Sequence, residues 1–259
     1  MAVRSGGAPA ALALLITVAG CGPGPLEAVT VNPSGLAEGL VAHWTFDETG
    51  GGAVADRSGS GHDGQLTGGS WISSGRFGGA LKLAPGDHVV VMNFPQATIG
   101  WTVSVWIRTS SDQLMSSNGG TDDWKTILST ENVFMGGWQL YLNSRPGLNR
   151  FDTAYWAGTT VNDYVVASCN CIATDRWLHL TAVFDGAASE LRFHDGDAVA
   201  DRRQMPIPIL PGDSTLYMGI WNQTGRFLAA DLDDVAIWSR ALAPAEVEVV
   251  SRQAVPDPG

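Results

Sequence analysis

The stretch that decides the fold is residues 39–64, which read GLVAHWTFDETGGGAVADRSGSGHDG. Its first part has an apolar residue at every second position, which is typical of a strand with one buried face: Leu40, Ala42, Trp44 and Phe46. Glycine, aspartate and serine then dominate, and they favour turns with positive φ and side-chain hydrogen bonds to the backbone. We therefore expect a strand that runs into a tight, acidic loop.

Working outward, short alternating segments recur at a spacing of roughly ten residues, which is the pattern of an all-β sandwich. The clearest is residues 101–109, where one face carries Trp101, Val103, Val105 and Ile107. In residues 231–240 the alternation places Leu232 and Asp234 on one face and Asp233 on the other. Pro244 suits the first turn of a short closing helix. The expected strands are residues 40–46, 80–83, 87–92, 101–109, 126–129, 137–143, 150–156, 177–184, 190–194, 215–218 and 231–240.

Five motifs occur in an order that resembles the laminin-G-like family, whose fold is the concanavalin A-like or pentraxin-like jelly roll. They are GLVAHWTFDE, DRSGSGHDG, GRFGGAL at 75–81, WTVSVWIRT at 101–109 and LDDVAIWSRALAPAEV at 232–247. The resemblance covers residues 39–252 and implies a two-sheet antiparallel jelly-roll sandwich with a short C-terminal helix. It implies little about function, because the family includes binding, adhesive and accessory proteins.

Residues 1–20 have the composition of a signal peptide. Arg4 supplies the positive start, residues 10–19 form a short apolar run, and residues 18–21 (VAGC) resemble the lipobox of bacterial lipoproteins. That resemblance implies cleavage before Cys21, lipidation of its thiol and a membrane anchor. Gly22 after the cysteine favours the bacterial outer membrane or cell surface. An ordinary signal peptide that is cut nearby remains the alternative.

The rest of the chain divides into a tether, one domain and a tail. Residues 21–38 are rich in proline and glycine at their start and lack periodicity, so we expect a flexible tether. Residues 39–253 carry the strand pattern of one laminin-G-like domain, and residues 254–259 form the tail. One all-β domain of this size is compatible with a chain of 259 residues.

The chain is acidic, with 15 Lys plus Arg against 26 Asp plus Glu and a net charge of −11. This balance argues against sequence-independent binding to nucleic acid. The cysteines other than Cys21 are Cys169 and Cys171, which are too far apart to bond in an extended strand. Because surface and periplasmic compartments are oxidising, we expect a disulfide between them in a tight bend.

Acidic residues at both ends of the domain are candidates for a structural calcium site: Asp47, Glu48, Asp56, Asp233 and Asp234. Calcium binds about six to eight oxygens from carboxylates and loop carbonyls. In the implied fold the first and last strands are neighbours, and laminin-G-like relatives often carry calcium at such a rim. In the alternative interpretation, Asp56 only caps its turn and Asp233 is solvated.

Candidate ligand contacts come from aromatic and amide side chains on polar strand faces or loops. Trp106 is the aromatic exception on the polar face of its strand, although it could equally fill a curved sheet. Trp124 follows Asp122 and Asp123 in a polar loop, where recognition residues commonly lie. Tyr141 and Asn143 share one face of residues 137–143, a type of surface on which sugars stack and hydrogen-bond.

No motif indicates an enzyme. The glucanase pattern Glu-x-Asp-x-x-Glu does not occur, and neither do Gly-x-Ser-x-Gly or His-Glu-x-x-His. We therefore expect a lipid-anchored binding module that recognises carbohydrate or a cell-surface protein. The alternatives are a purely adhesive or structural surface protein and a divergent polysaccharide-active glucanase-like or lyase-like enzyme.

Overall fold

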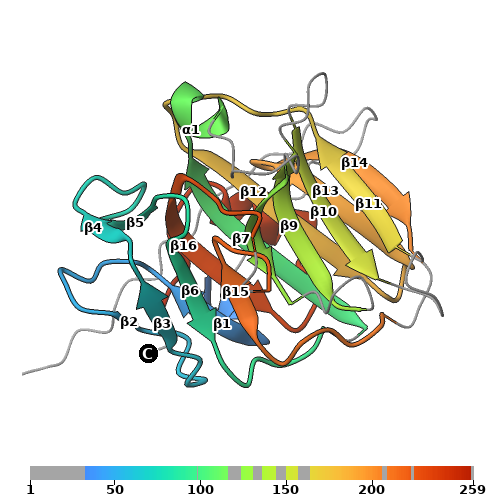
Figure 1. Cartoon of the computed structure of the whole chain (residues 1–259). Coiled ribbons are helices and arrows are strands. Elements are labelled where there is room, and N and C mark those ends of the chain that lie inside the picture. The colour runs from blue at the N-terminus through green and yellow to red at the C-terminus, as the bar shows by residue number, and fades with distance from the viewer. Residues whose placement is uncertain are drawn as a thin grey trace, which may run out of the picture.

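The computed structural model describes residues 33–97, 99–115, 124–130, 136–143, 150–156, 164–205, 209–222 and 225–257. Within them the chain forms two antiparallel sheets of eight strands each, which Figure 1 shows stacked in two layers. The first sheet has the order β14-β13-β12-β7-β16-β5-β4, and β1 also pairs with β16. The second has the order β11-β10-β9-β8-β15-β6-β3-β2. The expected all-β antiparallel sandwich is therefore confirmed.

The elements have these bounds: η1 Pro33–Ala37, β1 Leu40–Trp44, β2 Ala53–Val54, β3 Gly64–Thr67, β4 Ser70–Ile72, β5 Ala80–Leu83, β6 His88–Val91, β7 Gly100–Arg108, α1 Ser111–Met115, β8 Trp124–Ser129, β9 Trp138–Asn143, β10 Arg150–Trp156, β11 Tyr164–Cys169, β12 Leu178–Asp185, β13 Glu190–Asp195, β14 Ala198–Gln204, β15 Leu216–Met218, β16 Ala230–Trp238 and α2 Pro244–Val250. None of the helices among the described residues is long and apolar enough to cross a membrane.

The core lies between the sheets and is built from the apolar faces that alternation predicts. From β7 it takes Trp101, Val103, Val105 and Ile107, as expected. From β9 it takes Trp138, Leu140 and Leu142. Successive side chains of a strand point to opposite faces, so the intervening polar and aromatic residues of both strands lie on the outer faces.

A second apolar cluster covers the outer face of the first sheet, where α2 packs. It includes Leu36 from η1, whose carbonyl accepts the indole N–H of Trp238 at 2.7 Å. It also includes Val255, which is 4% exposed. The folded domain therefore begins before residue 39 and continues beyond residue 253. The sequence does not mark these two packed segments, because single apolar anchors in irregular segments leave no periodic pattern.

Strand β16 lies at the centre of the first sheet and pairs with β7, β5 and β1. The first and last strands of the domain are thus neighbours, as expected. A β-bulge lies between Asp233 and Ala236, and Asp234 has a φ of +45°. Leu232 and Val235 both face the core, so the expected pairing of Leu232 with Asp234 on one face is wrong. The extra residue of a bulge shifts the alternation by one position.

A glycine-rich turn, residues 75–79, joins this bulge to the end of β1, and we call it the glycine clasp. The amide of Gly75 donates to the carbonyl of Gly78 at 3.0 Å, which closes the turn. A Cβ on Gly75 would lie 1.8 Å from the carbonyl oxygen of Gly79. Gly78 has a φ of +73°, and a Cβ there would meet the carboxylate of Asp47. The turn therefore requires glycine for both space and backbone conformation.

We expect Gly75→Ala to destabilise the domain by about 1–3 kcal/mol, because the methyl group must displace backbone rather than a flexible side chain. Gly50→Ala is the matched control, since nothing lies within 4 Å of its Cβ position. It should change stability by no more than about 0.5 kcal/mol. Urea unfolding followed by tryptophan fluorescence measures both, and equal stabilities of the two variants would contradict the role of the clasp.

Candidate functional site

The carboxylate of Asp56 is engaged by its own turn and by β1. Its Oδ1 accepts the amides of His43 and Ser58, and its Oδ2 accepts the amide of His62 and the hydroxyl of Ser58, at 2.9 to 3.0 Å. Burial alone would raise the pKa of this carboxyl, but the hydrogen bonds outweigh burial and hold the pKa of Asp56 below its usual range. Asp56 thus fastens the acidic loop to the first strand.

Asp234 and His43 form a buried pair between β16 and β1. The Asp234 Oδ1 lies 2.7 Å from the Nε2 of His43, and its Oδ2 accepts the amide of Val255 at 3.1 Å. The other ring nitrogen of His43 lies 3.3 Å from a carboxylate oxygen of Asp257. This carboxylate pair around one imidazole ties the C-terminal segment to the first and last strands.

Asp233 is held by the glycine clasp. Its Oδ2 accepts the backbone amides of Arg76 and Phe77, the latter at 2.8 Å, while its Oδ1 is buried with no partner among the described residues. Burial raises the pKa of Asp233 to about 7, and the nearby charge of Asp234 adds to this. The two amide hydrogen bonds act in the opposite direction. Asp233 is therefore enclosed by the fold rather than solvated.

Asp47 and Glu48 lie on the other side of the clasp, at the rim. Asp47 accepts the amide of Gly79 at 2.6 Å, and the Oε1 of Glu48 accepts the amide of Ala55 at 2.9 Å. The Oε2 of Glu48 is buried with no partner among the described residues. Both carboxylates line a rim pocket of about 490 Å³ together with Trp71.

The five candidate calcium ligands are therefore not brought together as one cage. Within the described part of the chain, the group of three ligand-type side chains whose atoms lie within 4.8 Å of one another consists of Cys169, Cys171 and Asp195, and contains none of the five. Asp56, Asp233 and Asp234 serve as hydrogen-bond acceptors for the protein itself. The rim pair, Asp47 and Glu48, lines the rim pocket, and calcium binding stays a prediction.

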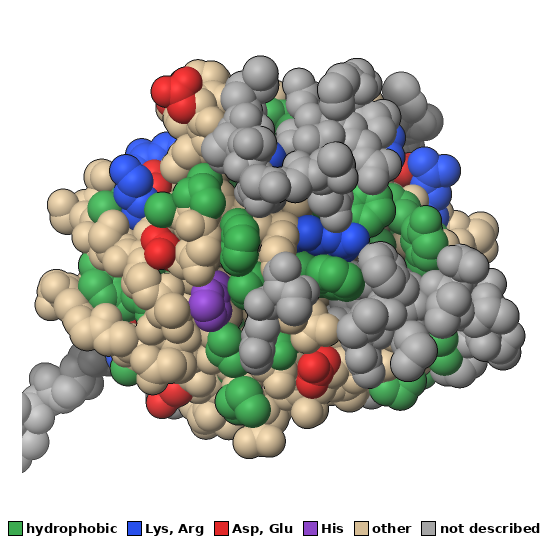
Figure 2. Space-filling model, in the orientation of Figure 1, with side chains coloured by type: hydrophobic (Ala, Val, Ile, Leu, Met, Phe, Trp, Pro, Cys, Tyr) green, Lys and Arg blue, Asp and Glu red, His purple; other side chains and the backbone are tan. Residues whose placement is uncertain are grey.

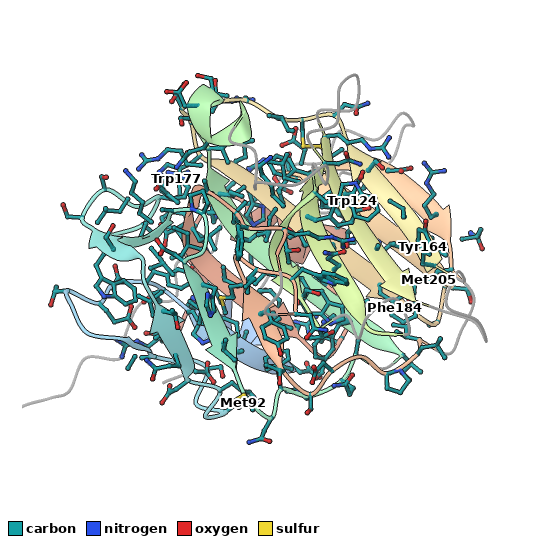
Figure 3. The ribbon with its side chains drawn as sticks, in the orientation of Figure 1. Met92, Trp124, Tyr164, Trp177, Phe184 and Met205 are labelled. Atoms are coloured by element: carbon teal, nitrogen blue, oxygen red, sulfur yellow. A yellow bond between two sulfur atoms is a disulfide. The ribbon has the colours of Figure 1, made fainter. Side chains whose placement is uncertain are left out.

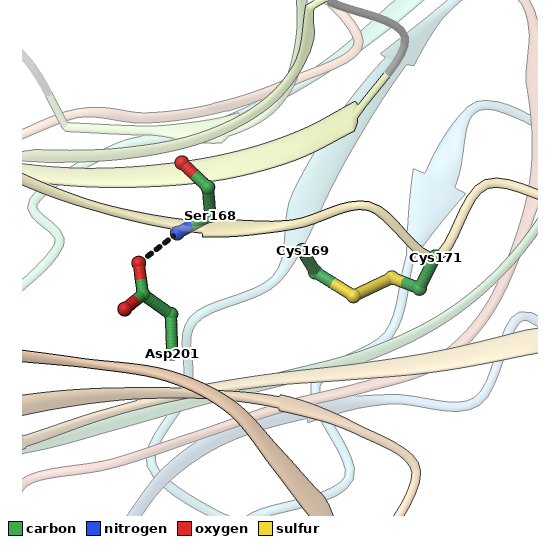
Figure 4. The surroundings of a disulfide bond; sticks show 4 residues. All are labelled: Ser168, Cys169, Cys171 and Asp201. Atoms are coloured by element: carbon green, nitrogen blue, oxygen red, sulfur yellow. Dashed lines mark hydrogen bonds between the residues drawn. A yellow bond between two sulfur atoms is a disulfide. The ribbon is translucent and has the colours of Figure 1, made fainter.

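The expected disulfide is present. The sulfur atoms of Cys169 and Cys171 are 2.02 Å apart and their Cα atoms 5.2 Å apart, in the bend that follows β11 (Figure 4). Beside it, the amide of Ser168 donates to the carboxylate of Asp201 at 3.0 Å. Because Ser168 lies in β11 and Asp201 in β14, this hydrogen bond joins the edges of the two sheets.

Trp106 is 6% exposed and is covered by the glycine clasp. The guanidinium of Arg76 lies 4.6 Å from the centre of its ring, and the ring of Phe77 meets it edge-on at 5.7 Å. The ring of His179 packs against it at 4.9 Å. Burial lowers the pKa of His179 to about 3, so this imidazole is neutral at physiological pH. The structure does not bring Trp106 to the face that carries the other candidate contacts.

The remaining candidates do meet, on the outer face of the second sheet. The rings of Trp124 and Tyr141 are 5.7 Å apart. The guanidinium of Arg226 lies 4.4 Å from the ring of Trp124 and 4.2 Å from that of Trp221. We call this set, together with Asn143 and Asp152, the aromatic face.

A buried polar network borders these rings. The amide of Asn143 donates to Asp152 at 3.3 Å, and the guanidinium of Arg150 lies 2.8 Å from the same carboxylate. Burial, followed by the charge of Asp152, raises the pKa of Tyr141, so its hydroxyl stays protonated and can donate. The network is buried, with Asn143 4% and Asp152 0% exposed, and it fixes donors and acceptors on the adjacent strands β9 and β10.

Figure 2 looks onto this side of the molecule and shows hydrophobic and basic side chains gathered near its centre. Figure 3 shows Trp124 over the second sheet, toward the end of the sandwich that carries α1. Sequence reasoning missed Trp221, Arg226 and Asp152 as members of the aromatic face, and it also missed Arg150, which pairs with Asp152. Arg226 has a φ of +54° and lies outside any strand, so no alternation marks it. Cys21, Asp122 and Asp123 lie outside the described residues.

The fold has many counterparts among solved structures. The ligand-binding domain of botulinum neurotoxin serotype D, in complex with N-acetylneuraminic acid, is 17% identical, with 85% of this chain and 52% of that chain covered and a TM-score of 0.63. The binding domain of Paraclostridial Mosquitocidal Protein 1 is 14% identical, with coverage of 83% and 52% and a TM-score of 0.65. This chain thus spans about half the length of these structures.

The sequence matches no curated protein. It does match the laminin-G family model described as the concanavalin A-like lectin/glucanases superfamily, over residues 83–248, which is more than half of the chain. The match begins within β5 and ends within α2, so it includes most of both sheets. The chain therefore belongs to the concanavalin A-like lectin/glucanases superfamily.

Proposed function

We propose that this protein is an extracytoplasmic binding module that recognises carbohydrate through the aromatic face. The observation that carries the proposal is the pairing of Trp124 and Tyr141 at 5.7 Å beside the network of Asn143 and Asp152. Sugar rings have apolar faces that stack on aromatic rings and hydroxyl edges that bond to amides and carboxylates.

The surroundings of these residues support a preformed site. Trp124, Asn143 and Arg150 lie on the neighbouring strands β8, β9 and β10. Asn143 is in register with Trp124 on one side and with Arg150 on the other. Side chains on paired strands keep their separation without a ligand, which lowers the entropic cost of binding. The rings on either side of Arg226 hold the guanidinium plane, so its orientation is fixed in the same way.

The solved structures support a binding role at the level of fold. Two of them are named as binding domains, and one of these holds N-acetylneuraminic acid. A glycan is favoured over a protein partner by the mixture of two aromatic rings with buried amide and carboxylate groups. Protein binding and adhesion remain alternative outcomes of the test below.

Binding without turnover fits the carboxylate chemistry of the aromatic face. A retaining glycosidase needs two carboxyl groups about 5–5.5 Å apart, and one of them must be free to attack. The carboxylate next to Tyr141 is Asp152, and it is engaged by Arg150 and Asn143. A carboxylate held by a guanidinium and an amide is not free to attack a sugar carbon. We therefore propose a lectin-like rather than a hydrolytic role.

On a glycan array, the chain with Cys21→Ser should bind a subset of glycans, and Trp124→Ala should weaken that binding by about tenfold or more. Trp71→Ala is the matched control, because Trp71 lies at the rim pocket of the other sheet and should bind normally. Melting curves must show that both variants are folded. Equal binding by wild type and Trp124→Ala would place the site elsewhere, and release of reducing ends would indicate an enzyme.

We also propose that Cys21 is lipidated and anchors the domain to the bacterial outer membrane or cell surface. The support is the VAGC sequence at residues 18–21 after a short apolar run. In a Gram-negative host the wild-type chain should sediment with membranes and incorporate labelled palmitate. Cys21→Ser should do neither, and palmitate labelling of that variant would contradict this proposal while leaving the binding proposal unaffected.

For calcium, we propose the rim pocket rather than the cage of five carboxylates. Asp47 is exposed there, and Glu48 has a buried oxygen without a partner among the described residues, which a cation would satisfy. Millimolar calcium should raise the melting midpoint of wild type relative to chelator, because binding to the folded state alone stabilises it. Glu48→Gln should lose this rise and Asp234→Asn should keep it. Identical wild-type melts in calcium and in chelator would exclude the ion.

A further inference from the structure

A second polar pocket of about 310 Å³ lies on the first sheet, where β5, β7 and β16 reach α1. Its lining includes Lys82, Arg108, Thr109, Asp175 and Asp231. It shares no residue with the aromatic face or with the rim pocket. Its volume lies at the lower end of the range of small-molecule sites, which suits a ligand of about one sugar ring.

The base of this pocket is a row of charged residues across three strands. Asp231 of β16 pairs in register with Lys82 of β5 and with Arg108 of β7. The guanidinium of Arg108 binds the Oδ2 of Asp231 through Nη2 at 2.8 Å and Nε at 2.9 Å. The same guanidinium lies 4.7 Å from the ring centre of Trp177. Arg108 is thus held from two sides, and the row is fixed before any ligand arrives.

Two oxygen atoms of the lining are buried without a hydrogen-bond partner among the described residues. They are the Oδ1 of Asp231 and the hydroxyl of Thr109, whose residues are 8% and 2% exposed. An unsatisfied buried polar atom destabilises the folded state, so such atoms call for a partner. Both atoms belong to residues that line the same pocket, and each can accept a hydrogen bond from a hydroxyl group.

Hydrogen bonds to the backbone position the walls of this pocket. The carbonyl of Thr109 accepts the amide of Asp175 at 2.8 Å, which brings the segment before β12 over the pocket. Ser110 and Gln113 exchange hydrogen bonds between backbone and side chain and thereby fix the start of α1. The pocket is consequently a built feature of the sandwich end rather than a gap between mobile side chains.

The charges of the lining indicate the ligand class. Two cations, Lys82 and Arg108, face two carboxylates, Asp175 and Asp231, so the formal charge of the lining is balanced. A phosphate or an ammonium group would meet as much repulsion as attraction there. A neutral polyol can donate to the carboxylate and accept from the cations at once. We propose that this pocket is a second binding site, which takes one neutral sugar residue.

Binding of a single sugar is weak, so the test needs a method that detects weak binding. NMR spectra of the full chain carrying Cys21→Ser are recorded while each probe is added. The probes are neutral methyl pyranosides of glucose, galactose and mannose, with inorganic phosphate as the anionic comparison. At least one pyranoside should shift the amide of Thr109 and the indole N–H of Trp177, with an affinity of about 1 mM. Phosphate should shift neither signal.

Thr109→Val removes the hydroxyl while keeping the shape, so it should fold normally and weaken pyranoside binding at least fivefold. Thr181→Val is the matched control: Thr181 also has a buried hydroxyl without a partner among the described residues, but it does not line this pocket. Trp124→Ala should leave these shifts unchanged, which separates this site from the proposed aromatic face. The proposal is overturned if no pyranoside shifts the signals, if phosphate competes for the site, or if Thr109→Val binds as well as wild type.

Discussion

The hydrogen bonds from the glycine clasp to Asp233 are the constraint on which the rim of the structure depends. Two backbone amides, those of Arg76 and Phe77, converge on one carboxylate oxygen in the bulge of β16. The same turn binds Asp47 through Gly79, so it joins the central strand to the end of β1. Arg76 and Phe77 then cover Trp106. A short turn therefore sets the register of the bulge, closes one side of the first sheet and shapes the rim pocket.

This arrangement explains how a carboxylate can be buried at this position. Backbone amides supply positive partial charge at fixed positions, and they satisfy one oxygen of Asp233 without further desolvation of a charged side chain. These hydrogen bonds do not fully offset the cost of burying the charged carboxylate, because burial still raises the pKa of Asp233 to about 7. Asp56 uses the same chemistry with more donors, and its pKa moves in the opposite direction. Asp233 is more deeply buried and also feels the charge of Asp234, whereas the hydrogen bonds to Asp56 outweigh its burial.

Much of the fold was predictable because its strands alternate. In β7 and β9 the apolar positions follow the expected period, and a sandwich with neighbouring first and last strands followed from the motifs. The bulge at Asp233 was not predictable, because one extra residue in a strand leaves no mark in composition. Strands β2, β3, β4, β11 and β14 were missed for related reasons. β2, β3 and β4 are very short, and β11 and β14 are partly exposed edge strands.

Some residues of the candidate site could likewise be predicted from the sequence, and others could not. Tyr141 and Asn143 follow from strand alternation, and Trp124 from its place at the end of a polar loop, so half of the aromatic face could be named in advance. Arg226 and Trp221 could not, because they reach the face from an irregular segment that is distant in sequence. The pocket around Asp231 also depends on register between three strands.

Amide hydrogen exchange of Arg76 and Phe77 tests the central claim most directly. If Asp233 holds the clasp, both amides exchange slowly in the wild-type chain, and Asp233→Ala accelerates them by about tenfold or more. The amide of Gly219, which is bonded to the carbonyl of Ile127 in the other sheet, should keep its protection and show that the variant is folded. Fast exchange of Arg76 and Phe77 in the wild type, or unchanged exchange in Asp233→Ala, would contradict the account.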